Sequence, residues 1–495
     1  MQRTEIFRIG LLLGLLLAIR AQAVGAPPRI DEYRTWVRQF MEAQKVPGAA
    51  VALVGRNGIL WSEGFGQRSR RDHRPVDSAT LFSIQSVSKT ITATAVLLAA
   101  QDGLVDLDAP ITRYLPDFTV NSAFERQPER KITLRLLLGH AAGLTHEPAV
   151  GNNFDCPFPS YQAHDQSIRD TWLKSPVGSR YSYSNCGFDL AAQALEKASG
   201  MPFAQYVRTR LFAPLGMASS TLDPAAAMRN KDRAEGSMFG LDRLPFAMPF
   251  PGAGSAYVSA GDLARFVRFH LDMGAVDGRQ VLKQKYLIDM YRPFITPDYA
   301  LGVAIAGSRG RFALNHNGGG FGWGATVTWL PQYGIGCLIL TNAQYAPGLY
   351  ELGQRILDDC VATGFAQQDT LFRFDPVSSF AARAPRTEDV PKQCPGDSIF
   401  KPSWKRYAGT YRLAFGPGYE FTWYARIARW LGYRVQKVRV TAQGDGLFMT
   451  YDNGSTSEAP QRLTEYLPGL FFAPDGEALD FRGDFPAYRN IKLEK

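Results

Sequence analysis

Phe82-Ser83-Ile84-Gln85-Ser86-Val87-Ser88-Lys89 leads into an apolar run from Thr90 to Ala100. If this run is a helix, Ser86 and Lys89 lie on one face, one turn apart. Apolar residues on nearly every face predict that the helix is buried all round. Burial would lower the pKa of Lys89, and the helix N-terminus would favour an oxyanion at Ser86. Taken alone, the pair also fits a capping serine beside a solvated lysine.

The composition is that of an ordinary globular protein. The 495 residues are 45% hydrophobic and 20% charged, with a formal net charge of +9. There is no long basic run, no zinc-finger spacing and no RNA-binding signature, so nucleic acid is not expected as a partner.

The first residues have the features of a signal peptide. Two arginines precede an apolar run over Ile9–Ile19, and Ala21-Gln22-Ala23 offers a small-x-small cleavage site. The run is short for a bilayer span. We therefore expect a signal peptide over residues 1–23 and a periplasmic or secreted protein. Because Arg20 interrupts the approach to the cleavage site, an uncleaved anchor and a membrane-associated protein are the alternative.

The cysteines allow disulfides but do not fix them. The five are Cys156, Cys186, Cys337, Cys360 and Cys394. An odd number leaves at least one thiol unpaired, and Cys337 lies in an apolar strand-like run that predicts a free core residue. Cys156 with Cys186 and Cys360 with Cys394 are candidate pairs. No Cys-x-x-Cys spacing supports a structural zinc site.

Hydrophobic periodicity and turn residues predict strands at both ends of a largely helical region. A sheet would therefore be assembled from distant segments. We expect helices over Ile30–Gln44, Phe188–Ser199 and Leu349–Val361, and strands over Ala49–Val54, Ile59–Phe65, Gly324–Leu330 and Ile335–Thr341. Thr133 is placed as the N-cap of a helix that begins at Leu134.

Two further clusters could complete a site with the first one. In Tyr183-Ser184-Asn185, the phenol could move protons and the amide could hold a substrate amide. In His316-Asn317-Gly318, followed by Gly319, the glycines would let a strand edge approach a ligand. His140 and His146 lack the spacing of a metal-binding pair and are interpreted as loop histidines.

In this order, the three clusters resemble the motifs of the serine β-lactamase and penicillin-binding-protein superfamily. The likeness is nearest to its class C-like branch of β-lactamases, D-amino-acid peptidases and esterases. It covers about Ile30–Thr363, where Ser86-Val87-Ser88-Lys89 matches Ser-x-x-Lys and Tyr183-Ser184-Asn185 matches Tyr-x-Asn. His316-Asn317-Gly318 takes the place of Lys-Thr-Gly. The resemblance implies an α/β (α+β) fold, in which an antiparallel sheet with flanking helices joins an all-helical region.

The resemblance also implies roles for these residues. Ser86 would be the acylated nucleophile, Lys89 would assist its deprotonation, and Tyr183 would be the general base or proton relay. Asn185, His316, Asn317 and Gly318 would bind substrate. The backbone N–H groups of Ser86 and Gly319 would form the oxyanion hole. No cofactor and no metal are expected.

His316 departs from the family pattern. Lysine at this place supplies a fixed positive charge for a substrate carboxylate, whereas histidine is only partly charged near neutral pH. We therefore expect an exported serine hydrolase acting on an ester or on an amide or peptide bond of a small-molecule or peptide substrate. The alternatives are a β-lactamase or D-Ala-D-Ala carboxypeptidase, and a non-catalytic penicillin-binding-like or scaffolding protein.

The tail differs from the rest of the chain. We expect a hydrolase domain over residues 24–370, a proline-rich linker over 371–404 and a small C-terminal domain over 405–495. Short alternating strands with Gly and Asn turns resemble the lipocalin-like β-barrel of some family members. Residues 421–433 interleave aromatics with arginine, which fits either contact with a membrane surface or a segment that covers the barrel or the cleft.

Overall fold

The structure, a computed structural model, describes most of the chain. The described residues are 27, 29–71, 73–151, 160–238, 241–242, 251–308, 311–320, 322–344, 346–369, 396, 398, 401–413, 437–452, 457–483, 487–489 and 491–494. The expected signal peptide, most of the expected linker and residues 421–433 lie outside them. Among the described residues, no helix combines the length and the apolar composition needed to cross a bilayer.

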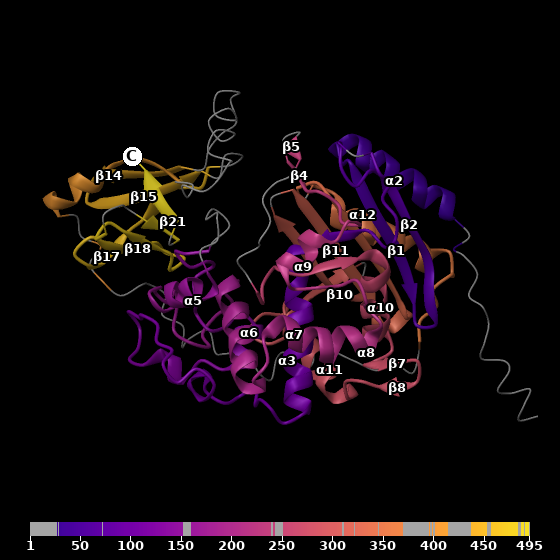
Figure 1. The fold of residues 1–495 in the computed structure, drawn as a ribbon. Coiled ribbons are helices and arrows are strands. Elements are labelled where there is room, and N and C mark those ends of the chain that lie inside the picture. The colour runs from indigo at the N-terminus through magenta and orange to yellow at the C-terminus, as the bar shows by residue number, and fades with distance from the viewer. Residues whose placement is uncertain are drawn as a thin grey trace, which may run out of the picture.

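An antiparallel sheet of six strands forms the centre of the N-terminal region, residues 29–369 (Figure 1). Its strand order is β2-β1-β12-β11-β10-β9, so the first strands pair with the last, as the sequence predicts. The strands are β1 (Gly48–Gly55), β2 (Gly58–Gly66), β9 (Ala304–Ser308), β10 (Arg311–Gly320), β11 (Trp323–Leu330) and β12 (Ile335–Thr341).

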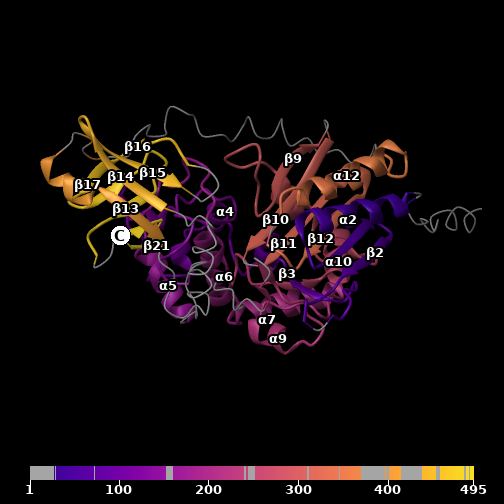
Figure 2. The same ribbon diagram turned by 90° about the horizontal axis from the view of Figure 1, so that it is seen from above.

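Helices cover both faces of this sheet (Figure 2). Along β1, Val51 and Leu53 pack in one core cluster, while Ala52 packs in the other, as alternating strand residues must. The first cluster lies under α2 (Ile30–Gln44) and α12 (Leu349–Ala362), and the second lies under α10 (Ala260–Leu271).

Helix α3 (Ser88–Gln101) runs through the larger core, as expected of a helix that is apolar on nearly every face. Twelve of its residues are buried, and Lys89 is among them. The helix begins later than expected, because Ser86 lies in a 3₁₀ turn, η1 (Gln85–Val87), that leads directly into it.

Shorter helices build the region beside α3. Thr133 caps α4 by accepting from the Leu136 N–H, as predicted. Ser184 caps α6 in the same way, so this helix begins three residues earlier than expected and includes Asn185. The helices are α4 (Leu134–Leu138), α5 (Tyr161–Arg169), α6 (Asn185–Ser199), α7 (Phe203–Val207), α8 (Ala213–Leu215), α9 (Pro224–Arg229) and α11 (Gln284–Tyr291). Two-stranded pairs complete it: β3 (Leu81–Ser83) with β6 (Tyr257–Ser259), β4 (Ser237–Met238) with β5 (Leu241–Asp242), and β7 (Ala275–Val276) with β8 (Arg279–Gln280).

The C-terminal region, residues 401–494, has its own core and lies next to α5 (Figure 1). Its described residues form one nine-stranded sheet with β16 and β17 at the two edges. These edges are not paired with each other within the described residues, so the expected closed barrel is not confirmed. The strands are β13 (Gly409–Leu413), β14 (Lys437–Gln443), β15 (Gly446–Asp452), β16 (Gln461–Arg462), β17 (Thr464–Leu467), β18 (Leu470–Phe472), β19 (Ala478–Asp480), β20 (Ala487–Tyr488) and β21 (Ile491–Glu494).

The cysteines differ from expectation in two places. Cys337 is a free buried thiol in β12, as predicted. Cys186 and Cys360 are also free and buried, so neither candidate disulfide forms in the structure. Each thiol instead lies against a neighbouring oxygen, with Cys360 Sγ 3.3 Å from the Tyr33 hydroxyl. Cys156 and Cys394 lie outside the described residues.

Candidate functional site

Ser86 and Lys89 are in direct contact. The Lys89 Nζ lies 3.1 Å from the Ser86 Oγ, 2.7 Å from the Asn185 Oδ1 and 3.0 Å from the backbone oxygen of Ala253. Two of these three partners are carbonyl oxygens, which can only accept hydrogen bonds. A charged ammonium could donate to all three partners, whereas a neutral amine would donate to the two carbonyl oxygens and accept from the Ser86 hydroxyl. The contacts fit both states, and in the neutral state Lys89 can take the proton of Ser86.

The electrostatics of Lys89 favour the neutral state. Its side chain is fully buried, and this burial lowers its pKa to about 7, against the smaller opposing effects of Asp189 and Glu147. A shift of this size makes protonation of the amine roughly 5 kcal/mol less favourable than in water. The pKa shift expected from the sequence is therefore present, and much of the amine is neutral near pH 7.

Strand β10 runs unusually close to the Ser86 turn. A Cβ on Gly318 would lie 2.1 Å from the Ile84 carbonyl oxygen and 3.1 Å from the Ser86 backbone nitrogen. Only glycine permits this approach. Gly319, the next residue, is exposed at the end of the strand. The backbone N–H groups of Ser86 and Gly319 thus belong to two segments in close contact, which is what an oxyanion hole requires.

Tyr183 completes a cluster with the first motif. Its ring lies 4.8 Å from the Lys89 Nζ, and its hydroxyl is near enough to Ser86 for that residue to influence its pKa. Burial raises the pKa of Tyr183 above its ordinary value, although the interaction with Ser86 opposes this. The phenol therefore stays protonated near neutral pH. It can relay a proton, but it is poorly suited to act as a phenolate base.

His316 lies in the cluster as a neutral imidazole. Burial lowers its pKa to about 3, with a further contribution from Lys89. Its Nδ1 lies 2.8 Å from the Asn317 carbonyl oxygen, which can only accept, so Nδ1 carries the proton. Its Nε2, 3.1 Å from the Tyr299 hydroxyl, must then accept from that hydroxyl. His316 supplies no positive charge to this site.

Asn317 is the one predicted site residue whose side chain is directed elsewhere. Its Oδ1 accepts from the Thr326 hydroxyl of β11 at 2.7 Å. Because neighbouring strand residues face opposite sides of the sheet, Asn317 lies on the face away from His316 and Gly318. The structure thus brings together Ser86, Lys89, Tyr183, Asn185, His316 and the Gly318-Gly319 backbone, without the side chain of Asn317.

Two residues that support the site were not identified from the sequence. His140 is buried, and its ring packs against that of Tyr183 in a tilted arrangement, with centroids 4.2 Å apart. It also fixes the loop before α6, because its Nδ1 accepts from the Ser184 N–H at 3.0 Å and its carbonyl oxygen accepts from the Ser182 N–H at 2.7 Å. Glu147, also buried, accepts from the Asn185 Nδ2 at 3.4 Å. Both residues are in loops, as expected of His140. Loop residues follow no hydrophobic periodicity, so their contacts with the site could not be predicted from the sequence.

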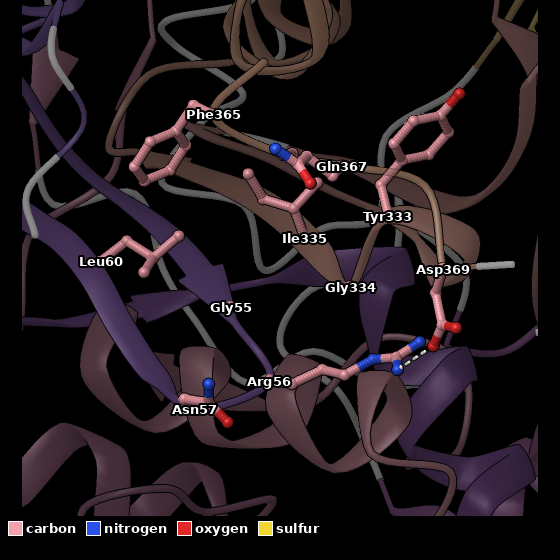
Figure 3. Close-up of a pocket in the computed structure, with 11 residues that line it drawn as sticks. Gly55, Arg56, Asn57, Leu60, Tyr333, Gly334, Ile335, Phe365, Gln367 and Asp369 are labelled. Atoms are coloured by element: carbon pink, nitrogen blue, oxygen red, sulfur yellow. Dashed lines mark hydrogen bonds and ion pairs between the residues drawn. The ribbon is translucent and has the colours of Figure 1, made fainter. Parts of the chain in front are cut away.

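A cavity of about 240 Å³ lies far from this cluster (Figure 3). It lies where β11 ends and β12 begins, beside the ion pair of Arg56 with Asp369 at 2.6 Å. Gly319 pairs with Gly324 at the opposite end of β11. Six residues of strand separate the two ends, or roughly 20 Å. The cavity is therefore distinct from the Ser86 cluster.

Comparisons with known proteins agree with this geometry. A family model described as Beta-lactamase matches residues 33–359. The chain is 26% identical over 340 residues to the "Unguisins hydrolase ungD'" of Aspergillus campestris, which covers 64% of this chain and 62% of that protein. It is 26% identical over 363 residues to the "D-alanyl-D-alanine-carboxypeptidase/endopeptidase AmpH" of Escherichia coli K12, covering 69% of this chain and 92% of that one. The match thus spans less than two thirds of the first relative.

A solved structure has the same fold. The octameric penicillin-binding protein homologue from Pyrococcus abyssi superposes with a TM-score of 0.60 at 18% sequence identity, covering 93% of this chain and 95% of that one. The expected α/β fold is therefore confirmed, as is the resemblance on which it was based. Because the family model matches about two thirds of its sequence, this chain belongs to the Beta-lactamase family.

Proposed function

We propose that the protein hydrolyses an ester or amide bond through an acyl-enzyme on Ser86. The observation that supports this most directly is the 3.1 Å contact between the Ser86 Oγ and the buried Lys89 Nζ, whose pKa burial lowers to about 7. The names of the two relatives, a hydrolase and a carboxypeptidase/endopeptidase, are compatible with this chemistry.

The proposed reaction has two stages. The Ser86 Oγ bonds to the acyl carbon while its proton passes to Lys89, and the resulting oxyanion accepts from the backbone N–H groups of Ser86 and Gly319. The bond to the leaving group then breaks, and the proton travels from Lys89 through Tyr183 to that group. In the second stage, water bonds to the acyl carbon while its proton passes to neutral Lys89. The bond to the Ser86 Oγ then breaks, Lys89 returns the proton to that oxygen, and the acid leaves.

The substrate class follows from His316. A neutral imidazole held by Tyr299 offers no fixed charge to a carboxylate. Substrates with no carboxylate near the scissile bond should therefore be preferred over penicillins and over peptides ending in a free D-alanine carboxylate. Esters, or amides without a carboxylate beside the scissile bond, are the proposed substrates.

A fluorophosphonate probe tests the acyl-enzyme proposal. The full chain should be labelled once, and peptide mapping should place the label on Ser86. With short-chain aryl esters, the amplitude of the initial burst of released alcohol should equal the fraction of protein that the probe labels. A chain that folds but takes no label at Ser86, with Ser86→Ala as control, would favour a non-catalytic binding protein. Faster turnover of a chromogenic cephalosporin than of the esters would overturn the proposed substrate class.

The proposal predicts the pH dependence of the reaction. Protonated Lys89 has no lone pair, so kcat/KM for a neutral ester should fall about tenfold per pH unit below pH about 7 and level off above it. His316, with a pKa of about 3, stays neutral throughout this range. A profile from pH 5 to 9 checks this, with circular dichroism to verify folding. A flat profile between pH 5 and 8 would show that the base is not Lys89.

Replacing His316 with lysine should change the preferred substrate. The new ammonium group would bind a carboxylate, so turnover of a carboxylate-bearing ester should rise about tenfold relative to its neutral analogue, or roughly 1.5 kcal/mol. His316→Gln is the matched control, since it stays neutral. The ratio of kcat/KM for the two esters is the measurement, and an unchanged ratio would mean that residue 316 does not face the substrate carboxylate.

We also propose that the protein acts in the periplasm or outside the cell. The support is the arginine-flanked apolar run followed by Ala21-Gln22-Ala23. N-terminal sequencing of protein expressed from the full gene would find residue 24 first if the signal is cleaved, and Met1 if it is not.

A further inference from the structure

A carboxylate of the C-terminal region is buried against the N-terminal region. Glu477, at the turn between β18 and β19, is 2% exposed. Its carboxylate lies 2.7 Å from the Lys174 Nζ, accepts from the Thr145 hydroxyl at 3.2 Å and lies 3.7 Å from the Arg489 Nε. A charge buried this deeply requires such partners, so the contact is specific and not a chance surface approach.

The turn that carries Glu477 fits tightly. Gly476 has φ +86, and a Cβ there would lie 2.0 Å from the Lys174 carbonyl oxygen. Arg180 Nη2 donates both to that oxygen, at 2.8 Å, and to the Asp475 carbonyl oxygen, at 2.5 Å. The turn is therefore held against the segment that leads to Tyr183.

Thr145 connects this turn to the Ser86 cluster. Its carbonyl oxygen accepts from the Ser184 hydroxyl at 2.6 Å. The next two residues hold Asn185, because the His146 carbonyl accepts from the Asn185 N–H at 2.8 Å and Glu147 accepts from its amide. Residues 145–147 thus fix both the cap and the first residue of α6.

A chain of three successive contacts therefore connects Glu477 to the reacting groups. Glu477 accepts a hydrogen bond from Thr145, and residues 145–147 in turn bond to Ser184 and Asn185. Asn185 accepts from the Lys89 amine at 2.7 Å. We propose that Glu477 is a positioning residue, through which the C-terminal region sets the geometry of Asn185 and Tyr183 beside Ser86. This rests on the function proposed above. A displacement of about 1 Å in such groups can lower a rate about 100-fold.

A purely adhesive role for Glu477 is the competing explanation. The same two regions also meet at Trp172, whose ring packs on Tyr466 and Phe472 with centroids 5.7 and 6.2 Å apart. If docking alone mattered, Trp172→Ala would have the same effect on the site as Glu477→Gln.

The matched control is Glu465→Gln. Glu465 is a carboxylate of the same region with similar partners, accepting from Lys401 and from the Trp404 Nε1 at 2.9 and 3.0 Å. None of these partners belongs to the N-terminal region. The substitution therefore removes a comparable charge without touching Thr145.

Hydrogen–deuterium exchange of the full chain tests the proposal independently of catalysis. In Glu477→Gln, amides in residues 181–187 should exchange at least about threefold faster, while Glu465→Gln and Trp172→Ala leave them unchanged. Thr145→Val should reproduce the effect, and the double variant should add little to either single change. Unchanged exchange in Glu477→Gln, or equal acceleration in Trp172→Ala, would overturn the proposal.

Labelling by the fluorophosphonate gives the second readout. The rate at Ser86 should fall about tenfold in Glu477→Gln and remain within about twofold of wild type in both controls. Faster exchange with unchanged labelling would show that the contact does not set the geometry of the site, and the inference would fail. A wild-type chain without label would overturn the proposed function, while exchange still decides whether Glu477 positions residues 181–187.

Discussion

Lys89→Met is expected to lower kcat/KM for an aryl ester by about 10³–10⁴-fold, the upper range for loss of a general base. Methionine keeps the length and the apolar stem of lysine but has no group that can accept the Ser86 proton. The rate constant for appearance of the acyl-enzyme, measured by stopped flow, should fall by the same factor because the proton leaves Ser86 in that step.

Lys89→Met should nevertheless fold. The folded-state pKa of about 7 lies below the unfolded value, so the unfolded chain binds more protons between these values and the buried amine lowers stability at neutral pH. Removing it relieves roughly 5 kcal/mol at most. The Asn185 and Ala253 oxygens lose a donor, at a cost of about 1–3 kcal/mol each. These effects nearly cancel, so the melting temperature should change by only a few degrees.

Lys131→Met is the control for the lysine substitution itself. Lys131 is exposed and pairs with Glu125 at the surface. Its replacement should leave both the melting temperature and kcat/KM near wild type. If Lys89→Met kept more than a tenth of the wild-type rate with native stability, a different group would have to be the base.

The sequence predicted those features that depend on local patterns. The apolar run after Lys89, the hydrophobic periodicity of Ile30–Gln44 and the capping residue Thr133 each specify an element through short-range preferences. Strand-like runs at both ends of one region predicted a sheet assembled from distant segments, and the pairing of β1 with β12 confirms it.

What the sequence could not predict depends on distant residues. The contact of Glu477 with Thr145 joins positions 332 residues apart. The neutral tautomer of His316 depends on Tyr299, and the packing of His140 against Tyr183 depends on how two loops fold together. That Cys186 and Cys360 are free thiols could not be predicted either. A disulfide requires two cysteines to lie within bonding distance in space, and their spacing in the sequence does not specify this distance.

Tyr183→Phe should separate the roles of the two proton-handling groups. Because the phenol stays protonated and lies close to Ser86, its proposed task is to deliver a proton to the leaving group. For an anilide or an alkyl ester, whose leaving group must be protonated, kcat/KM should fall about 10²–10³-fold. For a p-nitrophenyl ester, which departs as a stable anion, the loss should be less than about tenfold.

Tyr181→Phe is the matched control for this experiment. Burial raises the pKa of Tyr181 as well, and its ring also packs on His140, but Ser86 is not among the groups that shift its pKa. Its replacement should leave the ratio of anilide to p-nitrophenyl ester rates unchanged. An equal loss on both substrates in Tyr183→Phe would instead mean that the phenol acts before the tetrahedral intermediate forms. Tyr183 would then share with Lys89 the removal of the Ser86 proton. The relay through Tyr183 would carry a proton away from Ser86 and not toward the leaving group.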